Sequence, residues 1–239
     1  RSIDHQKSNE NSGRHMRIIS LLGSPHGLKG NTGRLLSIVL AGAEAEGAKV
    51  EVEILKGDTV LPCLGCDICH KKGYCAQKDR FEPLRESIAA ADGVVLASPN
   101  YIFNVSAQLK AFMDRCCGVI HCMSFWGKYG ASVVTSGGGD EEPIAEYMNH
   151  FLLTTGAVPV GAVSARMSEM PEGGFTDKVE EKARELGRRL VSAWRASEVP
   201  QPVQEQRQNF RERMQALITY RGPEWPYEYA YWQERLKAE

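Results

Sequence analysis

The sequence predicts a doubly wound α/β domain, a five-stranded parallel sheet in the order 2-1-3-4-5 with a helical and aromatic C-terminal extension. Short apolar runs alternate along the chain with stretches whose apolar residues recur at helical spacing. Such alternation requires a parallel sheet, because right-handed crossovers place the helices on its two faces. In addition, glycine-rich or aromatic turns follow three of the strand segments, at the sheet edge where this architecture holds ligands.

The elements follow one another in a regular order. Strands are expected at 16–23, 49–55, 93–99, 129–139 and 158–165. Helices are expected from about 31 to 47, around 84–88, over 107–116, around 144–152 and from 175 to 194. The first strand is mostly apolar, as expected for a strand buried on both faces, and the last helix carries an apolar stripe that belongs to the core.

The chain divides into three parts. Residues 1–15 are polar and are expected to be a disordered tail or an expression remnant outside the fold. The ligand-binding domain is expected over 16–197, with a cysteine loop at 63–75. Residues 198–239 begin with a proline-rich break, continue as an amphipathic helix and contain the aromatic run PEWPYEYAYW. This aromatic tail is expected to pack on its own domain or on another subunit.

Composition excludes several classes of function. The 239 residues include 29 Lys and Arg against 30 Asp and Glu, and no long basic run is present. Nucleic acid and anionic membrane are therefore poor candidates as partners. No apolar run is long enough to span a bilayer, and the N-terminal stretch lacks the apolar centre of a signal peptide. A cytoplasmic location is expected.

The turn after the first strand, residues 23–32, has the composition of a phosphate-binding loop. Its glycines let the backbone approach a ligand, and the following helix begins with free N–H groups. The turn matches neither a Walker A sequence nor G-x-G-x-x-G, which disfavours a nucleoside triphosphate or tightly bound NAD. Its local pattern is equally that of a plain glycine-rich turn with Asn31 as the helix N-cap.

Two further turns end at the same predicted edge. After the third strand, Tyr101 and Phe103 could pack a flat ring beside backbone amides, or could instead cap the core. After the fourth strand come three consecutive glycines, Gly137, Gly138 and Gly139. They have little packing value, which favours close approach to a ligand or a mobile lid.

Four of the seven cysteines, Cys63, Cys66, Cys69 and Cys75, form a compact run. In a chain without a secretion signal this clustering favours metal or redox chemistry, and the spacing is typical of an iron-sulfur site. Zinc, a disulfide and free thiols stay open as alternatives. The remaining cysteines, Cys116, Cys117 and Cys122, are expected to be small buried hydrophobic residues. The histidines His26, His70 and His121 are expected to be satisfied loop or core residues, with His70 in the cysteine loop.

The ligand turns carry a family resemblance. These turns resemble those of the NAD(P)H-dependent FMN reductases of the flavodoxin-like fold. The matching motifs are GSP at 23–25 with GNT at 30–32, P-x-Y at 99–101 before AQLKAFMDR, and GK at 127–128 before a strand and glycines. The resemblance covers about 16–194 and implies FMN as cofactor. It places the phosphate at Ser24, Gly30, Asn31 and Thr32, with His26 where the family often has arginine. The ring would be surrounded by Pro99, Asn100, Tyr101, Ile102, Phe103, Ser136, Gly137, Gly138 and Gly139.

The cysteine run, placed after the second strand, resembles that of the iron-sulfur flavoproteins. By this resemblance Cys63, Cys66, Cys69 and Cys75 would hold a 4Fe-4S cluster close to FMN. The expected function is an FMN-dependent oxidoreductase that passes electrons between FMN and the cluster. One alternative is an NAD(P)H-dependent FMN or quinone-type reductase without a cluster, and another is a zinc-containing flavodoxin-like binding module.

The expected chemistry belongs to the cofactors, so no acid-base or nucleophilic side chain is expected to be essential for catalysis. NAD(P)H is a candidate co-substrate, and the expected partner is a redox protein or a small-molecule electron acceptor. The resemblance also implies a homodimer or homotetramer. Neither nucleic acid nor membrane is expected as a partner.

Overall fold

The computed structural model describes residue 11 and residues 13–237, and its centre is a five-stranded parallel sheet. The strands lie in the order β2-β1-β3-β4-β5, which confirms the predicted topology. Their bounds are β1 (Arg17–Leu22), β2 (Lys49–Ile54), β3 (Gly93–Pro99), β4 (Tyr129–Ser136) and β5 (Val158–Arg166). The fourth strand ends at Ser136, so the three glycines follow it as a loop.

The expected helices are all present, and the structure adds helices that the apolar periodicity did not indicate. Their bounds are α2 (Asn31–Ala45), α3 (Ile68–Lys72), α4 (Phe81–Ala90), α5 (Ala107–Arg115), α6 (Cys117–Cys122), α7 (Glu141–Thr154), α8 (Asp177–Arg195), α9 (Gln201–Arg221) and α10 (Pro226–Lys237), with short 3-10 turns η1 (Gly27–Lys29), η2 (Met167–Glu169) and η3 (Pro171–Gly173). The single helix expected over 107–116 is followed, after Cys116, by the separate helix α6. The cysteine loop contains a short helix, α3, that periodicity did not indicate.

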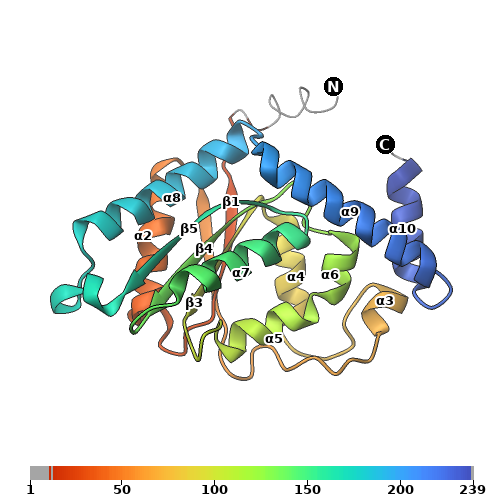
Figure 1. The fold of residues 1–239 in the computed structure, drawn as a ribbon, viewed down its shortest axis with the longest axis horizontal. Helices are drawn as coiled ribbons and strands as arrows, with labels where there is room; N and C mark the ends of the chain where they lie inside the picture. The colour runs from red at the N-terminus through yellow and green to blue at the C-terminus, as the bar shows by residue number, and fades with distance from the viewer. Residues whose placement is uncertain (1–10, 12, 238–239) are drawn as a thin grey trace.

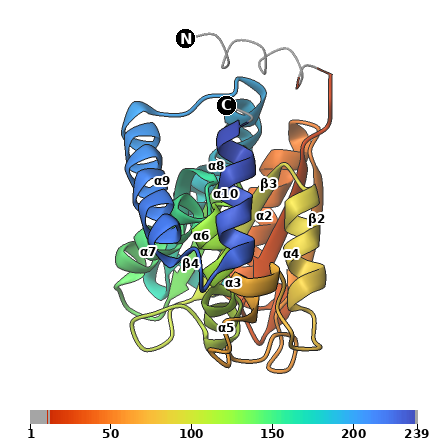
Figure 2. The same cartoon turned by 90° about the vertical axis from the view of Figure 1, so that its right-hand side faces the viewer.

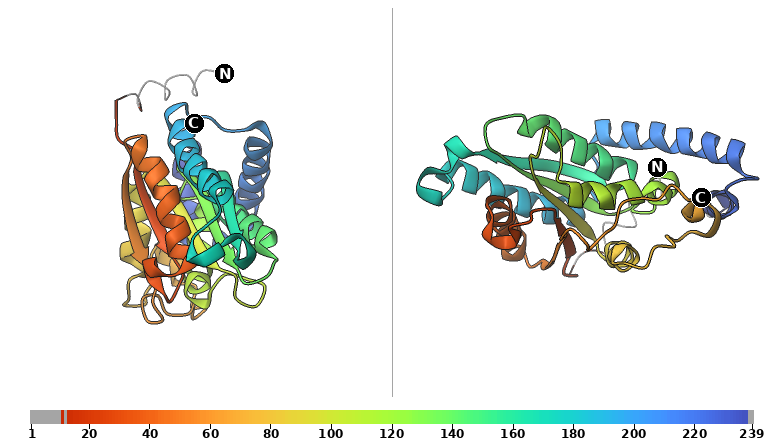
Figure 3. Two further views of the ribbon diagram at one scale, coloured as in Figure 1. Left: turned by 90° about the vertical axis from the view of Figure 1, so that its left-hand side faces the viewer. Right: turned by 90° about the horizontal axis from the view of Figure 1, so that it is seen from below.

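Helices cover the sheet on both faces. The apolar sides of α2 and α8 pack on one face, and those of α4, α5 and α7 pack on the other (Figure 1). Figure 3 shows α2 and α8 side by side. Their backbones touch, because a Cβ atom added to Gly187 would lie 2.0 Å from the Val39 carbonyl oxygen, and one added to Gly42 would lie 2.2 Å from the Arg184 carbonyl oxygen.

The C-terminal segment packs on its own chain. Met214 and Ile218 of α9 and Trp232 of α10 form a small buried cluster with Met123, which follows α6. Figure 1 shows α9 and α10 at one end of the molecule, and Figure 2 looks onto this end, with α10 beside α3. The aromatic tail therefore packs on its own domain, which is one of the two positions expected for it.

Of the predicted N-terminal tail, residues 1–10 and 12 lie outside the described residues. Asn11 donates a hydrogen bond to the carbonyl oxygen of Trp194, at 3.1 Å. Arg14 pairs with Asp92 at 3.3 Å. Throughout the described part of the chain, every helix is too short or too polar to cross a bilayer.

Parallel strands place the predicted ligand loops at one edge. Leu22 pairs with Ile54 and Ala97, and Pro99 pairs with Thr135, so β1 to β4 end close together. The segment after β2 runs along this edge, at the lower side of Figure 1, and leads to α3. The fold therefore brings the cysteine loop past the ends of the strands.

Candidate functional site

Hydrogen bonds join the three predicted ligand loops at the carboxyl edge of the sheet. The hydroxyls of Thr32 and Thr135 lie 2.6 Å apart, which links the start of α2 to β4. The Asn100 backbone N–H donates to the Thr135 carbonyl oxygen at 2.7 Å. The Asn100 side-chain amide donates to the Gly139 carbonyl oxygen at 3.0 Å. The loops after β1, β3 and β4 therefore form one surface.

The first loop presents the N-terminus of α2. Gly30 is the N-cap, and no side chain of the described chain caps the helix; Asn31 is its first residue, so the alternative with Asn31 as N-cap is wrong. The first-turn N–H groups are thus available to an anion, at the positive end of the helix dipole. Ser24 is buried in the loop, whereas His26 is exposed. The Thr32 hydroxyl is already engaged by Thr135, which leaves its backbone N–H for a ligand.

The second loop is a strained turn that displays apolar side chains. Ile102 and Phe103 have φ of 49° and 62°, a region that β-branched and aromatic residues rarely adopt. The backbone bonds between Tyr101 and Asn104, of 2.9 and 3.2 Å, close the turn. Ile102 is 91% exposed and Phe103 is 75% exposed, so Phe103 does not cap the core. Strain that serves no packing is typical of a ligand site.

Between the second and third loops the surface is suited to the edge of a polar ring. The Asn100 Oδ1 atom is buried and has no hydrogen-bond partner among the described residues. Gly137, Gly138 and Gly139 have open space where a Cβ would be. Ser136 is used within the loop, since its hydroxyl donates to Glu141 at 3.0 Å and accepts from the Gly139 N–H at 3.2 Å. An unpartnered amide oxygen, open glycines and an uncapped helix end fit FMN.

The cysteine loop carries free thiols. Cys63 and Cys66 are exposed, and Cys69 and Cys75 are half-buried. The Gly65 N–H donates to the Cys63 sulfur at 3.4 Å, and Arg115 donates to the Cys75 sulfur at 3.1 Å. Four free thiols in one loop, two of whose sulfurs accept hydrogen bonds, are a donor set that fits an iron-sulfur cluster.

Arg115 and Asp79 fix the buried side of this loop. Arg115 is 3% exposed and pairs with Asp79, and it lies over the Phe81 ring at 4.5 Å. Asp79 also accepts hydrogen bonds from the backbone N–H groups of Leu61 and Phe81, at 2.9 and 3.0 Å. Burial raises the pKa of Asp79, but the bonds from Arg115 and these amides outweigh it and hold the pKa below its ordinary value.

This lowered pKa predicts an acid-sensitive contribution to stability. A carboxyl with a depressed native pKa stabilises the fold fully above its unfolded pKa, near 3.8 here, and loses that contribution as the pH falls through its native pKa. We expect Asp79→Asn to be less stable than the wild type at pH 7. The difference in the free energy of unfolding should shrink below about pH 4. Urea denaturation of both proteins at several pH values measures this difference. A difference that does not change with pH would contradict the lowered pKa of Asp79.

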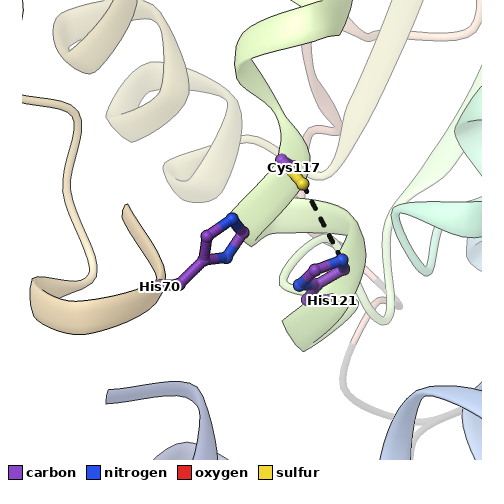
Figure 4. A group of neighbouring side chains, drawn as sticks. All are labelled: His70, Cys117 and His121. Carbon is purple, nitrogen blue, oxygen red and sulfur yellow. Dashed lines mark hydrogen bonds between the residues drawn. The ribbon is translucent and has the colours of Figure 1, made fainter. Parts of the chain in front are cut away.

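A second cluster of potential ligands lies outside the four-cysteine motif. Among the described residues, the side chains that could hold a metal as a group of three are His70, Cys117 and His121, whose ligand atoms all lie within 4.8 Å of one another. Figure 4 shows the two imidazoles beside Cys117. The motif cysteines do not form such a group. Cys116 and Cys122 are buried as predicted, but Cys117 faces two histidines, so its assignment as a small hydrophobic residue is wrong.

Glu228 of α10 organises this cluster. Its carboxylate is fully buried and bonds the Nδ1 atoms of His70 at 2.6 Å and of His121 at 3.0 Å. Trp225 stacks on the His70 ring, with a centroid distance of 4.6 Å, and lies tilted against the His121 ring, at 5.0 Å. Hydrogen bonds from His121 and His70 lower the pKa of Cys117 to about 6 despite its burial. Both histidines are therefore satisfied, as predicted, but their meeting with Cys117 was not predicted. The spacing of Cys117 and His121, about one helical turn, was the local signal that could have indicated it.

Comparison with known proteins agrees with this geometry. Residues 16–170 match the family described as NADPH-dependent FMN reductase. An iron-sulfur flavoprotein of Archaeoglobus fulgidus is 34% identical over 221 residues, which cover 92% of this chain and 99% of that protein. An NAD(P)H dehydrogenase (quinone) of Methanosarcina acetivorans is 31% identical over 148 residues, 57% of this chain and 68% of that protein.

Solved structures share the fold at lower identity. A flavodoxin, WrbA-like protein from Agrobacterium tumefaciens aligns with a TM-score of 0.55 and 18% identity, covering 77% of this chain and 99% of that one. The apo form of an NADH:FMN oxidoreductase aligns with a TM-score of 0.55 and 18% identity, over 78% of this chain and 92% of that one. The fold, the flavin-type loops and the family match lead to one conclusion: the chain belongs to the NADPH-dependent FMN reductase family and is a flavin-dependent oxidoreductase.

Proposed function

We propose that the protein transfers electrons between FMN and a 4Fe-4S cluster held by Cys63, Cys66, Cys69 and Cys75. The observation that carries the proposal is the meeting of three flavin-type loops with a free-thiol loop at one edge of the sheet. The iron-sulfur flavoprotein of Archaeoglobus fulgidus, similar over nearly its whole length, supports the second cofactor.

The flavin would be held by its two ends. The first-turn N–H groups of α2, with the hydroxyl of Ser24, would bind the phosphate, as the uncapped helix end supports. The unpartnered Asn100 Oδ1 would accept a hydrogen bond from the ring edge. Ile102 and Phe103 would cover one ring face and keep water from it. This role would explain why both side chains are exposed and why their backbone adopts a strained conformation.

The protein's role is to position the cofactors and set their surroundings. Bound FMN accepts a hydride or two electrons and releases them singly, and a cluster moves one electron at a time. Arg115 would bring a positive charge to the Cys75 sulfur, and the Gly65 N–H would donate to that of Cys63. Both contacts stabilise negative charge at the sulfurs and so favour the reduced state. No side chain is required to move a proton in this account.

Ser24→Ala tests the phosphate assignment. A hydrogen bond to a charged group contributes about 1.5–3 kcal/mol, so the dissociation constant for FMN should rise about 10- to 100-fold. Affinity for riboflavin, which lacks the phosphate, should stay unchanged. Quenching of flavin fluorescence by the flavin-free protein measures both. Ser37→Ala is the matched control, since Ser37 is exposed on α2, the helix that follows this loop, and its hydroxyl bonds the Gly33 carbonyl oxygen. Equal losses of affinity for FMN and riboflavin would contradict the phosphate assignment.

Anaerobic purification followed by iron, sulfide, zinc and flavin analysis tests the pairing of cofactors. We expect FMN with about four irons per chain. FMN without iron, together with steady-state NAD(P)H oxidation, would favour the alternative of a quinone-type reductase, to which the Methanosarcina acetivorans relative is similar. Zinc without flavin would overturn both in favour of a binding module.

The electron partners and the assembly complete the proposal. NAD(P)H is the proposed donor, because the family is described as NADPH-dependent. A redox protein or a small-molecule acceptor would receive the electrons at the exposed loop around Ile102 and Phe103. A homodimer or homotetramer is the proposed assembly, and sedimentation velocity of the flavin-loaded protein measures it.

A further inference from the structure

The cluster of His70, Cys117 and His121 has no part in the electron-transfer proposal. Its three side chains come from two helices: Cys117 and His121 are one turn apart on α6, and His70 lies on α3. Spacing of four residues puts two side chains on one helix face, the arrangement by which helices present paired metal ligands. We propose that these residues form a mononuclear zinc site, separate from the four-cysteine motif.

The orientation of the histidines supports a metal. Glu228 bonds the Nδ1 atom of each ring, at 2.6 Å for His70 and 3.0 Å for His121, which leaves both Nε2 atoms as ligands. A carboxylate on the second nitrogen is the usual support of a metal-bound histidine, because it fixes the ring and increases its basicity. Here a single buried carboxylate supports both rings.

The distances are close to those of tetrahedral zinc. Zinc binds imidazole nitrogen at about 2.0–2.1 Å and thiolate sulfur at about 2.3 Å, so the two ligand atoms lie about 3.6 Å apart. The Cys117 sulfur lies 3.7 Å from His121 Nε2. All three ligand atoms lie within 4.8 Å, so shifts of about 1 Å complete the set. His70 Nε2 is 3.9 Å from the exposed Asp67 carboxylate, too far for a hydrogen bond that would compete.

Charge and burial favour an ion over a nucleophilic thiol. One thiolate and the Glu228 carboxylate balance the two charges of Zn²⁺ when both imidazoles are neutral. A catalytic Cys-His-Glu arrangement needs one imidazole and an open thiol. In this protein a second imidazole approaches the same sulfur, and Trp225 lies against both rings. The donor set of two nitrogens and one sulfur is one that zinc accepts, and it leaves a fourth position for water.

The site would tie three distant segments together. His70 belongs to the cysteine loop, Cys117 to α6, and Glu228 to α10. Trp232 adds a hydrogen bond from its ring N–H to the His121 carbonyl oxygen, at 3.0 Å. An ion here would hold the cysteine loop in place independently of any cluster.

Zinc analysis of the full-length protein tests the site. After equilibration with one equivalent of Zn²⁺ and desalting, we expect one zinc per chain in the wild type. Cys117→Ser and His121→Asn should retain less than about a tenth of it. Cys122→Ala is the matched control: its thiol lies on the same helix but outside the group, so zinc should be retained. Cys66→Ser, in the four-cysteine motif, should likewise retain one zinc.

One measurement on the wild type remains decisive even where a variant folds poorly, and a further variant tests the carboxylate behind the ligands. Zinc-edge X-ray absorption of the wild type should show a shell of nitrogen with sulfur. Glu228→Gln should weaken zinc binding about 10- to 100-fold, the usual effect of losing a carboxylate behind a ligand. An all-sulfur shell would place the metal in the motif and overturn the proposal. So would zinc binding that is equal in the wild type and Cys117→Ser, or lost in Cys66→Ser.

Discussion

Arg115→Met should lower the free energy of unfolding by about 3–5 kcal/mol, the cost of leaving a buried charge without its partner. Met fills a similar volume, so the loss comes from Asp79, whose side chain is only 6% exposed. The Leu61 carbonyl oxygen and the Cys75 sulfur lose their donor at the same time. Urea denaturation followed by circular dichroism measures the change.

Two further variants separate the charge pair from general damage to α5. Lys110→Met removes an exposed cation on the same helix, where the pair with Asp114 contributes about 0.3–0.5 kcal/mol. Asp79→Asn combined with Arg115→Met should recover part of the loss, because the unpaired charge is gone. A loss below about 1 kcal/mol for Arg115→Met would show that Asp79 finds solvent or another donor.

Gly187→Ala should also destabilise strongly, because its Cβ would lie 2.0 Å from the Val39 carbonyl oxygen and 2.7 Å from the Ala43 nitrogen. Both are backbone atoms of α2, so no side chain can rotate away and the helices must separate. Overpacking of this kind typically costs about 1–3 kcal/mol or more, which exceeds the gain of about 1 kcal/mol in helix propensity from Gly to Ala.

The expected result is a lower denaturation midpoint with an unchanged slope in urea. Ser192→Ala is the control on the same helix: Ser192 is exposed and bonds only the Arg189 carbonyl oxygen, so its effect should stay within about 0.5 kcal/mol. Stabilisation by Gly187→Ala would mean that α2 and α8 adjust at little cost, and that their close packing is not required.

The sheet was predictable because its signals are local. Four of the five strands are mostly apolar runs and β2 alternates charged and apolar residues, and the parallel topology follows from the intervening helices. The glycine and aromatic turns after β1, β3 and β4 were predictable as a group for the same reason, since parallel strands end at one edge. Their hydrogen bonds, such as that from Asn100 to Gly139, could not be read from the sequence.

The features of the site that could not be predicted from the sequence depend on tertiary contacts. His70 and Glu228 are separated by 158 residues, and His121 and Glu228 by 107, so no window along the chain contains the cluster. The strained turn at Ile102 and Phe103 lacks the glycine or asparagine that usually indicates positive φ. In both cases contacts with distant parts of the chain determine the arrangement, and the neighbouring residues alone do not favour it.

The contact between Glu228 and His70 also sets an order of events in the cell. A chain is synthesised from its N-terminus, and the parts made first begin to fold before the rest exists. The cysteine loop and α6 are therefore made well before α10, and until residue 228 emerges both histidines lack the carboxylate that bonds them. This end of the molecule reaches its final arrangement only when translation has passed Glu228, long after the five strands have been made.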